Sequence, residues 1–571
     1  MKKHTLILAL FLFALTLQAQ IDKSKVTIDL SQFQEEEAQL QTNTDLVLVG
    51  EYLYYKMFAL SNGKLSNISK IGYVELIDAN NNTIVKHILN LKNSAASQRI
   101  FIPTELKTGH YKLIAYTNWT KNNLEKSYFA KNVYVINAFS NTNQNITTNN
   151  APIQLSKVKT LEVPVQNNNN IVISTPKQTY SNRELVTIDV ETNTFFKDGN
   201  YSLSINKVDS IALENTLKDT FIAETPSNTL FIPEMRGQLI TGTITNTVNP
   251  LDIKNKNVAL SVPGKNFDFK ISETNAFGQF FFNLDTKLHS NSATFQVIED
   301  NNNEYKIEIN KGNKNNYANN NFSNLEIDNN LKYTLENRNI KNQIENAYYQ
   351  NKKDSLLTEF KTKSFYKTKE KLYVLNEYTR FKTVRETFIE IPNEAGLRKD
   401  GDNYRIIVYD RYDEKKSQAI RNIDPLVIVD GMIVQNNNDL VNYDSYKIES
   451  IGIVVGQYLY GTKLYQGIIS ISTSTKDFKT SIKGDFITET ALNLPEDETL
   501  YFQPEYLSSA DNKRVPDYRR QLLWVPKTNL NEVNNSFTTY TSDDKGTYKV
   551  TVEGYNTNGE YILSASYFNV K

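Results

Sequence analysis

Residues 425–434 read Pro-Leu-Val-Ile-Val-Asp-Gly-Met-Ile-Val, and this stretch decides how its part of the chain folds. Leu426–Val429 is a continuous apolar run of the kind found in strands that are buried on both faces. Asp430-Gly431 is the dipeptide favoured in a two-residue type I′ turn, because both central residues of that turn need a positive φ. Met432–Val434 then predicts the returning strand of a hairpin. Asp430 is expected to shape the turn, with a binding role for its carboxylate as the alternative.

Three more pieces follow this hairpin in order. Ile448–Ile451 fits a short helix or turn that runs into a strand, Tyr460-Gly461 marks a tight bend, and Gly467–Ser472 indicates a final strand. Together these pieces predict an α+β domain over residues 385–476. A generic α+β domain with a chance hairpin is the alternative interpretation of the same residues.

This ordered set of pieces resembles the plug domain of TonB-dependent outer-membrane transporters. In those proteins the plug folds inside a barrel of about 22 strands, each of which needs about ten residues of alternating polarity. Residues 474–571, which follow the last piece, are too few to build that barrel. The residues before 385 also show no convincing equivalent of the short segment that pairs with TonB. The resemblance therefore implies a plug-like unit without its barrel, and not a transporter by itself.

Short runs of alternating apolar and polar residues dominate the rest of the chain, and they predict β-sandwiches. In the first sandwich, Gly109–Thr117 predicts a closing strand, and with Gly50-Glu51 ahead of it this unit resembles the macroglobulin-type domains of α2-macroglobulins and of many exported Bacteroidetes proteins. In the third, the Gly-containing turn and strand at 275–282 resemble those of regulatory-like domains. The last resembles the closing sandwich of the same Bacteroidetes envelope family. The expected fold class is mainly β, with tandem immunoglobulin-like, macroglobulin-type sandwiches, one α+β plug-like domain and a short helical connector. The four sandwiches are expected at residues 26–138, 171–230, 231–311 and 477–571.

Two connecting segments differ from these sandwiches in composition. Residues 141–170 are rich in Asn, Thr and Gln and too polar to bury a face, so they are expected to be a linker. Residues 312–384 are expected to form a helical and aromatic connector. Within it, the apolar residues recur every four or five positions and predict a helix over 331–362 that docks by one apolar face. These residues are Leu331, Leu335, Ile340, Ile344 and Tyr348.

Residues 1–19 have the parts of a secretory signal peptide: Lys2 and Lys3, an apolar run from Thr5 to Leu17, and a cleavage site after Ala19. An uncleaved anchor helix is the alternative, although the apolar run is short for spanning a bilayer. No other segment of the sequence predicts a transmembrane helix. The chain has no cysteine, which excludes disulfides and a lipid anchor on an N-terminal cysteine. The expected location is the periplasm or an association with the outer membrane.

The charges balance, with 64 Lys and Arg against 64 Asp and Glu, so no basic field points to nucleic acid. His87, His110 and His289 stand apart in strand-like contexts, without the partners that a metal or catalytic site needs. The Cys-Gly-Glu-Gln thioester of α2-macroglobulins is absent, which excludes covalent trapping of proteases. The sequence thus predicts no enzyme, no cofactor and no metal. Three clusters offer oxygen ligands for calcium but favour hairpin turns, at 78–82, 299–303 and 400–403.

Two functions remain after these exclusions. In the first, implied by the resemblance, the protein associates with an outer-membrane β-barrel or occludes it, as plug proteins of the type 9 secretion system do. In the second, the sandwiches bind a glycan or peptide for a separate TonB-dependent uptake system. Large exposed aromatic residues could anchor a partner, although filling a sandwich core is the more common use of such residues. The candidate interaction residues are Asp430, Gly431, Tyr460, Gly461, Tyr518 and Trp524.

Overall fold

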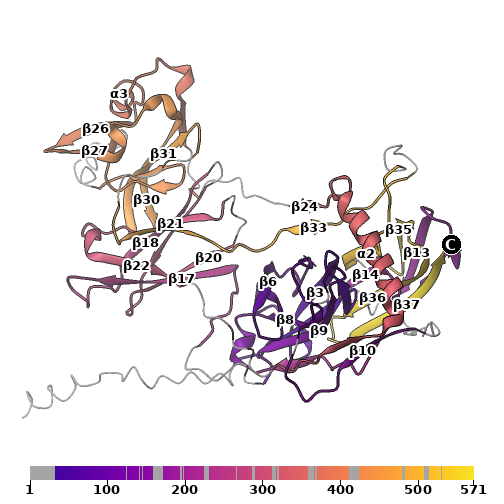
Figure 1. The fold of residues 1–571 in the computed structure, drawn as a ribbon. Helices are drawn as coiled ribbons and strands as arrows, with labels where there is room; N and C mark the ends of the chain where they lie inside the picture. Colours follow the sequence, from indigo (N-terminus) through magenta and orange to yellow (C-terminus); the bar gives the residue numbers. More distant parts are fainter. Residues whose placement is uncertain are drawn as a thin grey trace, which may run out of the picture. The chain divides into compact units, whose positions relative to one another are not determined.

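Strands far outnumber helices in the computed structural model, which confirms the predicted mainly β fold class (Figure 1). The signal peptide predicted for residues 1–19 lies outside the described residues. Short 3₁₀ turns lie at Thr120–Asn122, Asn302–Glu304, Asn329–Leu331, Tyr349–Asn351, Leu375–Glu377 and Ser445–Lys447. The structure describes residues 33–123, 125–140, 142–144, 146–158, 171–192, 196, 198–223, 230–264, 267–285, 288, 290–310, 315, 317, 320–357, 365–366, 370–409, 423–476, 478, 483–506, 514–528, 530 and 532–571.

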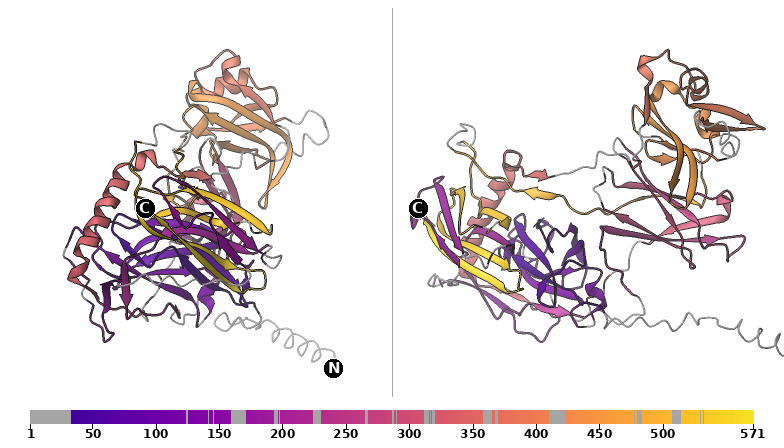
Figure 2. Two further views of the ribbon diagram at one scale, coloured as in Figure 1. Left: turned by 90° about the vertical axis from the view of Figure 1, so that its right-hand side faces the viewer. Right: turned by 180° about the vertical axis from the view of Figure 1, so that it is seen from behind.

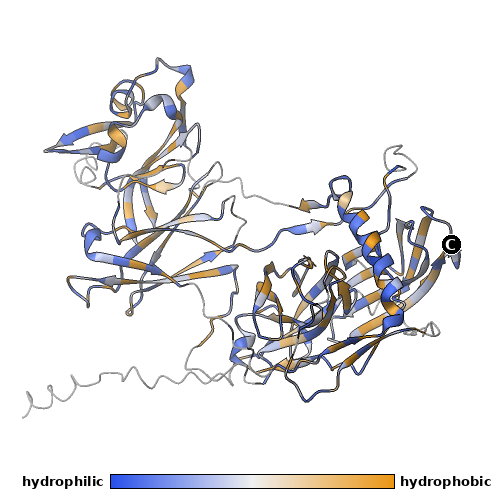
Figure 3. Ribbon diagram, viewed as in Figure 1, coloured by the Kyte–Doolittle hydropathy of each residue, from blue (hydrophilic) through white to orange (hydrophobic). Residues whose placement is uncertain are grey.

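The first sandwich spans residues 36–136 and encloses a core in which Leu53, Tyr55 and Leu113 are completely buried. Orange and blue residues alternate along many strands in Figure 3, as expected where one face of a strand is buried. One sheet holds β1 (Glu37–Thr42), β3 (Tyr52–Ser61), β4 (Lys64–Leu65) and β7 (Ala95–Phe101). The other holds β2 (Leu46–Leu48), β5 (Ile71–Ile77), β6 (Thr83–Asn90), β8 (Gly109–Tyr116), β9 (Tyr128–Ile136) and, from later in the chain, β16 (Thr220–Ile222).

The second sandwich is built from two distant parts of the sequence, which Figure 2 shows as purple and yellow strands side by side. Its two sheets share one core, so neither segment buries its apolar face without the other. The prediction of separate sandwiches at 171–230 and 477–571 is therefore wrong. One sheet holds β11 (Ile171–Ser174), β13 (Leu185–Thr192) and β35 (Asn534–Tyr540). The other has the order β12 (Thr179–Tyr180), β37 (Tyr561–Val570), β36 (Gly546–Tyr555), β14 (Asn200–Lys207) and β34 (Gln521–Thr528).

A three-stranded sheet and helix α2 pack against the first sandwich through one apolar cluster. The linker predicted for 141–170 is wrong in part, because Ile153 and Leu155 alternate with polar residues and are buried in this cluster. The helix is present but ends at Ala347, and Ile340 is 57% exposed although its spacing predicted an apolar docking face. These elements are β15 (Ile211–Glu214), β10 (Ile153–Lys157), β23 (Leu325–Ile327) and α2 (Lys332–Ala347).

The third sandwich also takes a strand from beyond its predicted range of 231–311. β32 (Ile487–Ala491) adds to the edge of one sheet, so it belongs here and not to a closing sandwich. The short strands β24 (Ser355–Leu357) and β33 (Glu498–Leu500) pair with each other. The remaining strands are β17 (Gln238–Asn246), β18 (Asn257–Val262), β19 (Asp268–Glu273), β20 (Gln279–Leu284), β21 (Ser292–Val297) and β22 (Tyr305–Ile309).

The α+β unit predicted for 385–476 begins earlier, because β25 (Lys371–Val374) extends its sheet by pairing with β30. The unit has a core of its own. Asp430 has a φ of 50° and Gly431 a φ of 91°, which confirms the predicted type I′ turn. The five-stranded sheet continues with β30 (Ile448–Tyr460), β31 (Lys463–Thr473), β28 (Leu426–Val429) and β29 (Met432–Ile433), and the other elements are α3 (Val384–Glu390), β26 (Ala395–Asp400), β27 (Asn403–Val408) and α5 (Asn438–Val441).

Candidate functional site

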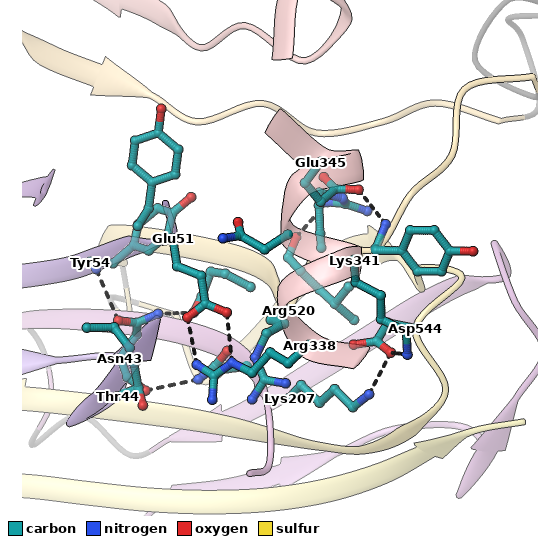
Figure 4. A pocket seen from close by; sticks show the side chains of 18 of the residues that line it. Asn43, Thr44, Glu51, Tyr54, Lys207, Arg338, Lys341, Glu345, Arg520 and Asp544 are labelled. Atoms are coloured by element: carbon teal, nitrogen blue, oxygen red, sulfur yellow. Dashed lines mark hydrogen bonds and ion pairs between the residues drawn. The ribbon is translucent and has the colours of Figure 1, made fainter. Parts of the chain in front are cut away.

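A cavity of about 440 Å³ lies where the first sandwich, the second sandwich and α2 meet (Figure 4). Its size is within the range of natural small-molecule sites, which is about 300–1,000 Å³. Its lining is mixed, with eight Lys and Arg side chains, five Asp and Glu side chains and several large aromatic rings. Three walls hold these groups, and each wall is fixed by contacts that the local sequence supplies.

The first sandwich supplies the wall around Asn43 and Thr44. The Asn43 side chain accepts a hydrogen bond from the Tyr54 N–H at 3.0 Å, and the Asn43 N–H donates to the Tyr54 carbonyl at 3.0 Å. The Thr44 hydroxyl accepts from the Leu46 N–H at 3.2 Å. Short polar side chains of this kind satisfy backbone groups between strands, so this wall is held without a regular ladder.

Helix α2 supplies the second wall through polar side chains. The guanidinium of Arg338 donates to both carboxylate oxygens of Glu51 at 2.7 Å and to Asp209 at 2.5 Å (Figure 4). Asn342 and Asn346 donate to the carbonyls of residues 49 and 50. The start of the helix docks through Leu331 and Leu335, as the apolar spacing predicted, and the turns that follow dock through charge-assisted and amide hydrogen bonds.

Arg338 is almost completely buried, and its partners decide its charge. Burial on its own lowers the pKa of Arg338, but the carboxylates of Glu51 and Asp209 more than offset this and raise the pKa overall. Burial likewise opposes the ionised form of Asp209, yet Arg338 and Arg520 hold the pKa of Asp209 below its usual value. Arg338 and Asp209 thus each favour the charged form of the other inside the protein, and each charge is needed by its neighbours.

The second sandwich supplies the third wall through Asp544, whose side chain is only 2% exposed. Its Oδ1 atom accepts from the Lys207 ammonium at 2.7 Å and from the Lys341 ammonium at 2.6 Å. Near this wall, Glu345 of α2 pairs with Lys352 at 2.7 Å and accepts from the Tyr518 N–H at 2.5 Å. These contacts join α2 to the turn before β36, which β14 also contacts, and to the segment before β34.

Aromatic rings close the remaining side of the cavity. The ring of Tyr54 lies 5.8 Å from Trp524 and 5.3 Å from Tyr501, measured between centroids. The Arg99 guanidinium lies 3.8 Å from the centroid of the Tyr52 ring. Trp524 is 3% exposed, and its indole N–H has no hydrogen-bond partner among the described residues. A buried donor without a partner lowers stability unless a ligand or a water satisfies it.

The structure separates the six candidate residues into two groups. Tyr518 and Trp524 both line the cavity. The other four lie at the contact between the α+β unit and the third sandwich. The Asp430 carboxylate accepts from the Thr473 N–H at 2.7 Å and from its hydroxyl at 2.5 Å, so it fastens the turn to β31. A Cβ atom on Gly431 would lie 2.3 Å from the Phe267 side chain.

Tyr460 and Gly461 form the second contact of this pair of turns. The Tyr460 hydroxyl donates to the Phe269 carbonyl at 2.6 Å, and the two rings stack with centroids 5.6 Å apart. A Cβ atom on Gly461 would lie 2.8 Å from Ile271. These residues mount the α+β unit on the third sandwich, which is a contact within the chain.

The structure also shows the positions of the residues for which the sequence predicted a structural role. Asp78 accepts from the backbone N–H groups of Asn80 and Asn82, which confirms a turn. His87 and His110 lie in β6 and β8, and burial lowers the pKa of each to about 4. His289 lies outside the described residues. Among the residues that the structure does describe, no three His, Cys, Asp or Glu side chains gather as a metal site requires.

Sequence reasoning missed the charged part of the cavity. Lys207, Asp209 and Asp544 are single charges in strand-like or turn-like contexts, with no local signal. The helix did carry a signal, because its polar residues recur every three or four positions along one face. These residues are Arg338, Lys341, Asn342, Glu345 and Asn346.

No family model matches the chain, and no curated protein matches it. Among solved structures, Salmonella α2-macroglobulin reacted with methylamine is 10% identical, with a TM-score of 0.22, over 96% of this chain and 41% of its own. Trypsin-activated α2-macroglobulin from Escherichia coli is 8% identical, with a TM-score of 0.23, over 96% and 43%. The Yersinia pseudotuberculosis adhesin InvE is 9% identical, with a TM-score of 0.13, over 48% and 57%.

The chain thus spans less than half the length of the two macroglobulins. At these identities and TM-scores the matches assign no function. Within the described residues, every helix is too short or too polar to cross a bilayer.

Proposed function

We propose that the protein is a non-catalytic recognition protein of the bacterial cell envelope that holds a small polar solute in this cavity. The observation that carries the proposal is a cavity of about 440 Å³ with Trp524 in its wall, a residue whose buried indole N–H has no hydrogen-bond partner in the part of the chain that the structure describes. A ligand that accepts this hydrogen bond would remove the cost of burying the donor. Aromatic rings beside fixed polar groups are the usual composition of a site that binds one small molecule.

The rigidity of the walls supports the same proposal. Glu51, Asp209 and Asp544 each tie two or more structural elements together through ion pairs. A site whose groups are already held in place loses less entropy when a ligand binds. The signal-peptide-like residues 1–19 and the lack of cysteine are consistent with an exported protein whose stability comes from its cores.

Fluorescence can test the proposal directly, because the chain has only two tryptophans, Trp119 and Trp524. In a Trp119→Phe background, the emission reports on the cavity alone. A panel of mono- and oligosaccharides and short peptides is titrated into the mature protein, and thermal unfolding is followed in parallel. We expect at least one solute to change the Trp524 emission and to raise the melting temperature, because it binds the folded state.

Two variants make this test specific. Trp524→Phe keeps an aromatic ring and removes the donor, so it should weaken binding by about tenfold, the cost of one hydrogen bond. Binding to this variant is followed by thermal unfolding, because it lacks the tryptophan that reports on the cavity. The control is Tyr446→Phe, an exposed residue of the α+β unit, which should bind as the parent does. The proposal fails if no solute in the panel affects either signal, or if both variants bind equally well.

Docking to an outer-membrane β-barrel is a second candidate, favoured by the build of the α+β unit. The unit has its own core and is mounted on the third sandwich at two turns, so it is presented as a separate module. Ile389 and Tyr446 of this module are each 60% exposed. The resemblance of its sequence to the plug domain of TonB-dependent outer-membrane transporters suggests the kind of partner.

The docking candidate is tested by a pull-down of the tagged protein from its native envelope in mild detergent. A variant in which a Gly-Ser linker replaces residues 371–476 provides the comparison. A barrel that co-purifies with the parent but not with the variant would support docking. Recovery of the same barrel with both forms, or with neither, would rule out this unit as the docking element.

A further inference from the structure

Positive charge is in excess at one end of the cavity. The ammonium groups of Lys207 and Lys341 share a single carboxylate oxygen of Asp544, at 2.7 Å and 2.6 Å. One carboxylate neutralises only one of two ammonium groups, so the pair carries one surplus positive charge. Figure 4 shows both lysines converging on Asp544 from different elements. Lys341 comes from α2 and Lys207 from β14.

The neighbouring ion pairs do not remove this surplus. Arg520 pairs with Asp209 at 3.2 Å, but Asp209 also pairs with Arg338 at 2.5 Å. Arg338 in turn pairs with Glu51 at 2.7 Å. Those two arginines and two acids balance one another. The surplus therefore stays at the lysine pair, with the Arg520 side chain beside it.

The shift in the pKa of Lys207 is consistent with a surplus of positive charge at the lysine pair. Burial is the largest influence and lowers the pKa of Lys207, Asp544 opposes it, and Arg520 and Lys341 lower it further. The two neighbouring cations thus act against the charged form of Lys207. An anion placed among the three would relieve this repulsion.

The groups around the lysine pair indicate what else the anion carries. The Tyr518 ring lies within 5.7 Å of the Lys341 ammonium, and Trp524 offers its unpartnered donor from the same cavity. One surplus charge matches a monoanion better than a doubly charged phosphate. A carboxylate is the monoanion whose two oxygens fit a pair of ammonium groups and a guanidinium.

We infer that the cavity binds a solute bearing one carboxylate, held by Lys207, Lys341 and Arg520, with the rest of the solute against the aromatic wall. This inference rests on the proposed recognition function and adds the chemical class of the ligand. The carboxylate can belong to an acidic sugar or to the C-terminus of a short peptide. Both sources present the same group to the same three side chains.

Matched pairs of probes distinguish the two sources. Glucuronate is compared with glucose, and trialanine with trialanine amide, so each pair differs chiefly in the carboxylate. Binding to the mature Trp119→Phe protein is followed by Trp524 fluorescence and by calorimetry. We expect the acid of at least one pair to bind about tenfold more tightly than its neutral partner, a difference that should shrink as salt is added. The pair that shows this difference identifies the source.

A charge-removing variant locates the carboxylate. Lys341→Gln leaves Asp544 paired with Lys207, so the buried acid keeps a partner and the fold should remain intact. We expect this variant to lose about tenfold in affinity for the acid and little for the neutral partner. Lys332→Gln is the matched control, because Lys332 is an exposed lysine of the same helix that does not line the cavity.

The outcomes separate the inference from the function on which it rests. If glucose or trialanine amide binds as well as its acid, the carboxylate assignment is overturned and the recognition function stands. If Lys341→Gln and Lys332→Gln bind the acid equally, the assignment to this lysine pair is overturned. If none of the four probes binds while other solutes of the panel do, the carboxylate class is excluded. If nothing in the panel binds, both the inference and the proposed function are overturned.

Discussion

Two contacts between domains of this protein differ in composition. The contact of the first sandwich with the second sandwich and α2 includes apolar residues such as Leu335, but it also contains many polar pairs, such as Gln41 with Ser202 and Arg338 with Glu51, and we call it the polar contact. The contact of the third sandwich with the α+β unit is apolar, with Phe269 and Ile428 in one buried cluster. Ion pairs fix the direction of side chains but fill space poorly, whereas apolar side chains close the gaps between them. The polar contact therefore encloses a cavity.

Of the substitutions considered, removal of Arg338 should lower the free energy of unfolding the most, because it disrupts the polar contact. Arg338→Ala leaves the largely buried carboxylate of Glu51 without its arginine and leaves Asp209 with Arg520 alone. We expect a loss of about 3–5 kcal/mol in the free energy of unfolding, as for other buried ion pairs that lose one partner. Urea denaturation of the mature protein measures this loss.

The control is Arg405→Ala, which removes an ion pair between Arg405 and Asp424 at the surface. Exposed pairs of this kind contribute about 0–1 kcal/mol. An Arg338→Ala variant that is no less stable than Arg405→Ala would show that the buried ion pairs do not hold the contact together.

Acid should destabilise the first sandwich, away from both contacts, through His110. Its Nδ1 accepts from the Ser323 N–H at 3.1 Å, which requires a neutral ring, and burial lowers its pKa from 6.5 to about 4. The unfolded chain therefore binds more protons between these values, and stability falls as the pH drops from 6.5 to 4. The loss contributed by this residue reaches about 3 kcal/mol at the lower end.

Urea denaturation at several pH values from 7 to 4 checks this expectation. His110→Asn should be less stable at pH 7 but should show a shallower decline below pH 6.5. A decline of the same steepness in the parent and the variant would assign the acid sensitivity to other groups, of which His87 is the first to examine.

Two substitutions at Tyr460 test which of its interactions stabilises the apolar contact. Tyr460→Ala removes the ring that stacks on Phe269 and should cost about 2 kcal/mol, less than a fully buried ring because Tyr460 is partly exposed. Tyr460→Phe removes only the hydrogen bond to the Phe269 carbonyl and should cost about 1 kcal/mol. Limited proteolysis of the segment before β25 reports the loosening. Equal losses for the two variants would mean that the hydrogen bond and not the ring stabilises this contact.

A substitution at Lys56 should have the smallest effect on stability, and it should raise stability where the other substitutions lower it. It is 2% exposed, lies 4.7 Å from the Phe58 ring, and its ammonium group has no hydrogen-bond partner among the described residues. Burial lowers its pKa well below 10.5, so the unfolded chain binds more protons over that window and stability rises with pH there.

Lys56→Met should therefore stabilise the protein at neutral pH by about 1 kcal/mol and remove this dependence on pH. Chemical denaturation at pH 7 and above checks both effects. A loss of stability in Lys56→Met would indicate that the amine is paired in solution.

The sequence predicted local structure better than it predicted which distant strands pair with each other. The hairpin at 425–434 follows from an apolar run and an Asp-Gly turn, both of which act over a few residues. The pairing of β13 with β35 has no such signal, because the pattern of a strand does not specify which distant strand completes its sheet. The cavity was missed for a related reason. Apolar spacing pointed to Ile340, which is 57% exposed, while Arg338 of the same helix is the buried anchor.

The divided second sandwich sets the order in which the chain can mature. Strands β11 to β14 leave the ribosome or the export channel long before β34 to β37, with the third sandwich and the α+β unit in between. During that interval their apolar residues, such as Val186 and Leu203, have no partner strands to cover them. The inserted units can fold first because each has its own core. A chain truncated within its last strands would keep those units. Its second sandwich would be incomplete and would expose apolar residues that quality-control proteases recognise.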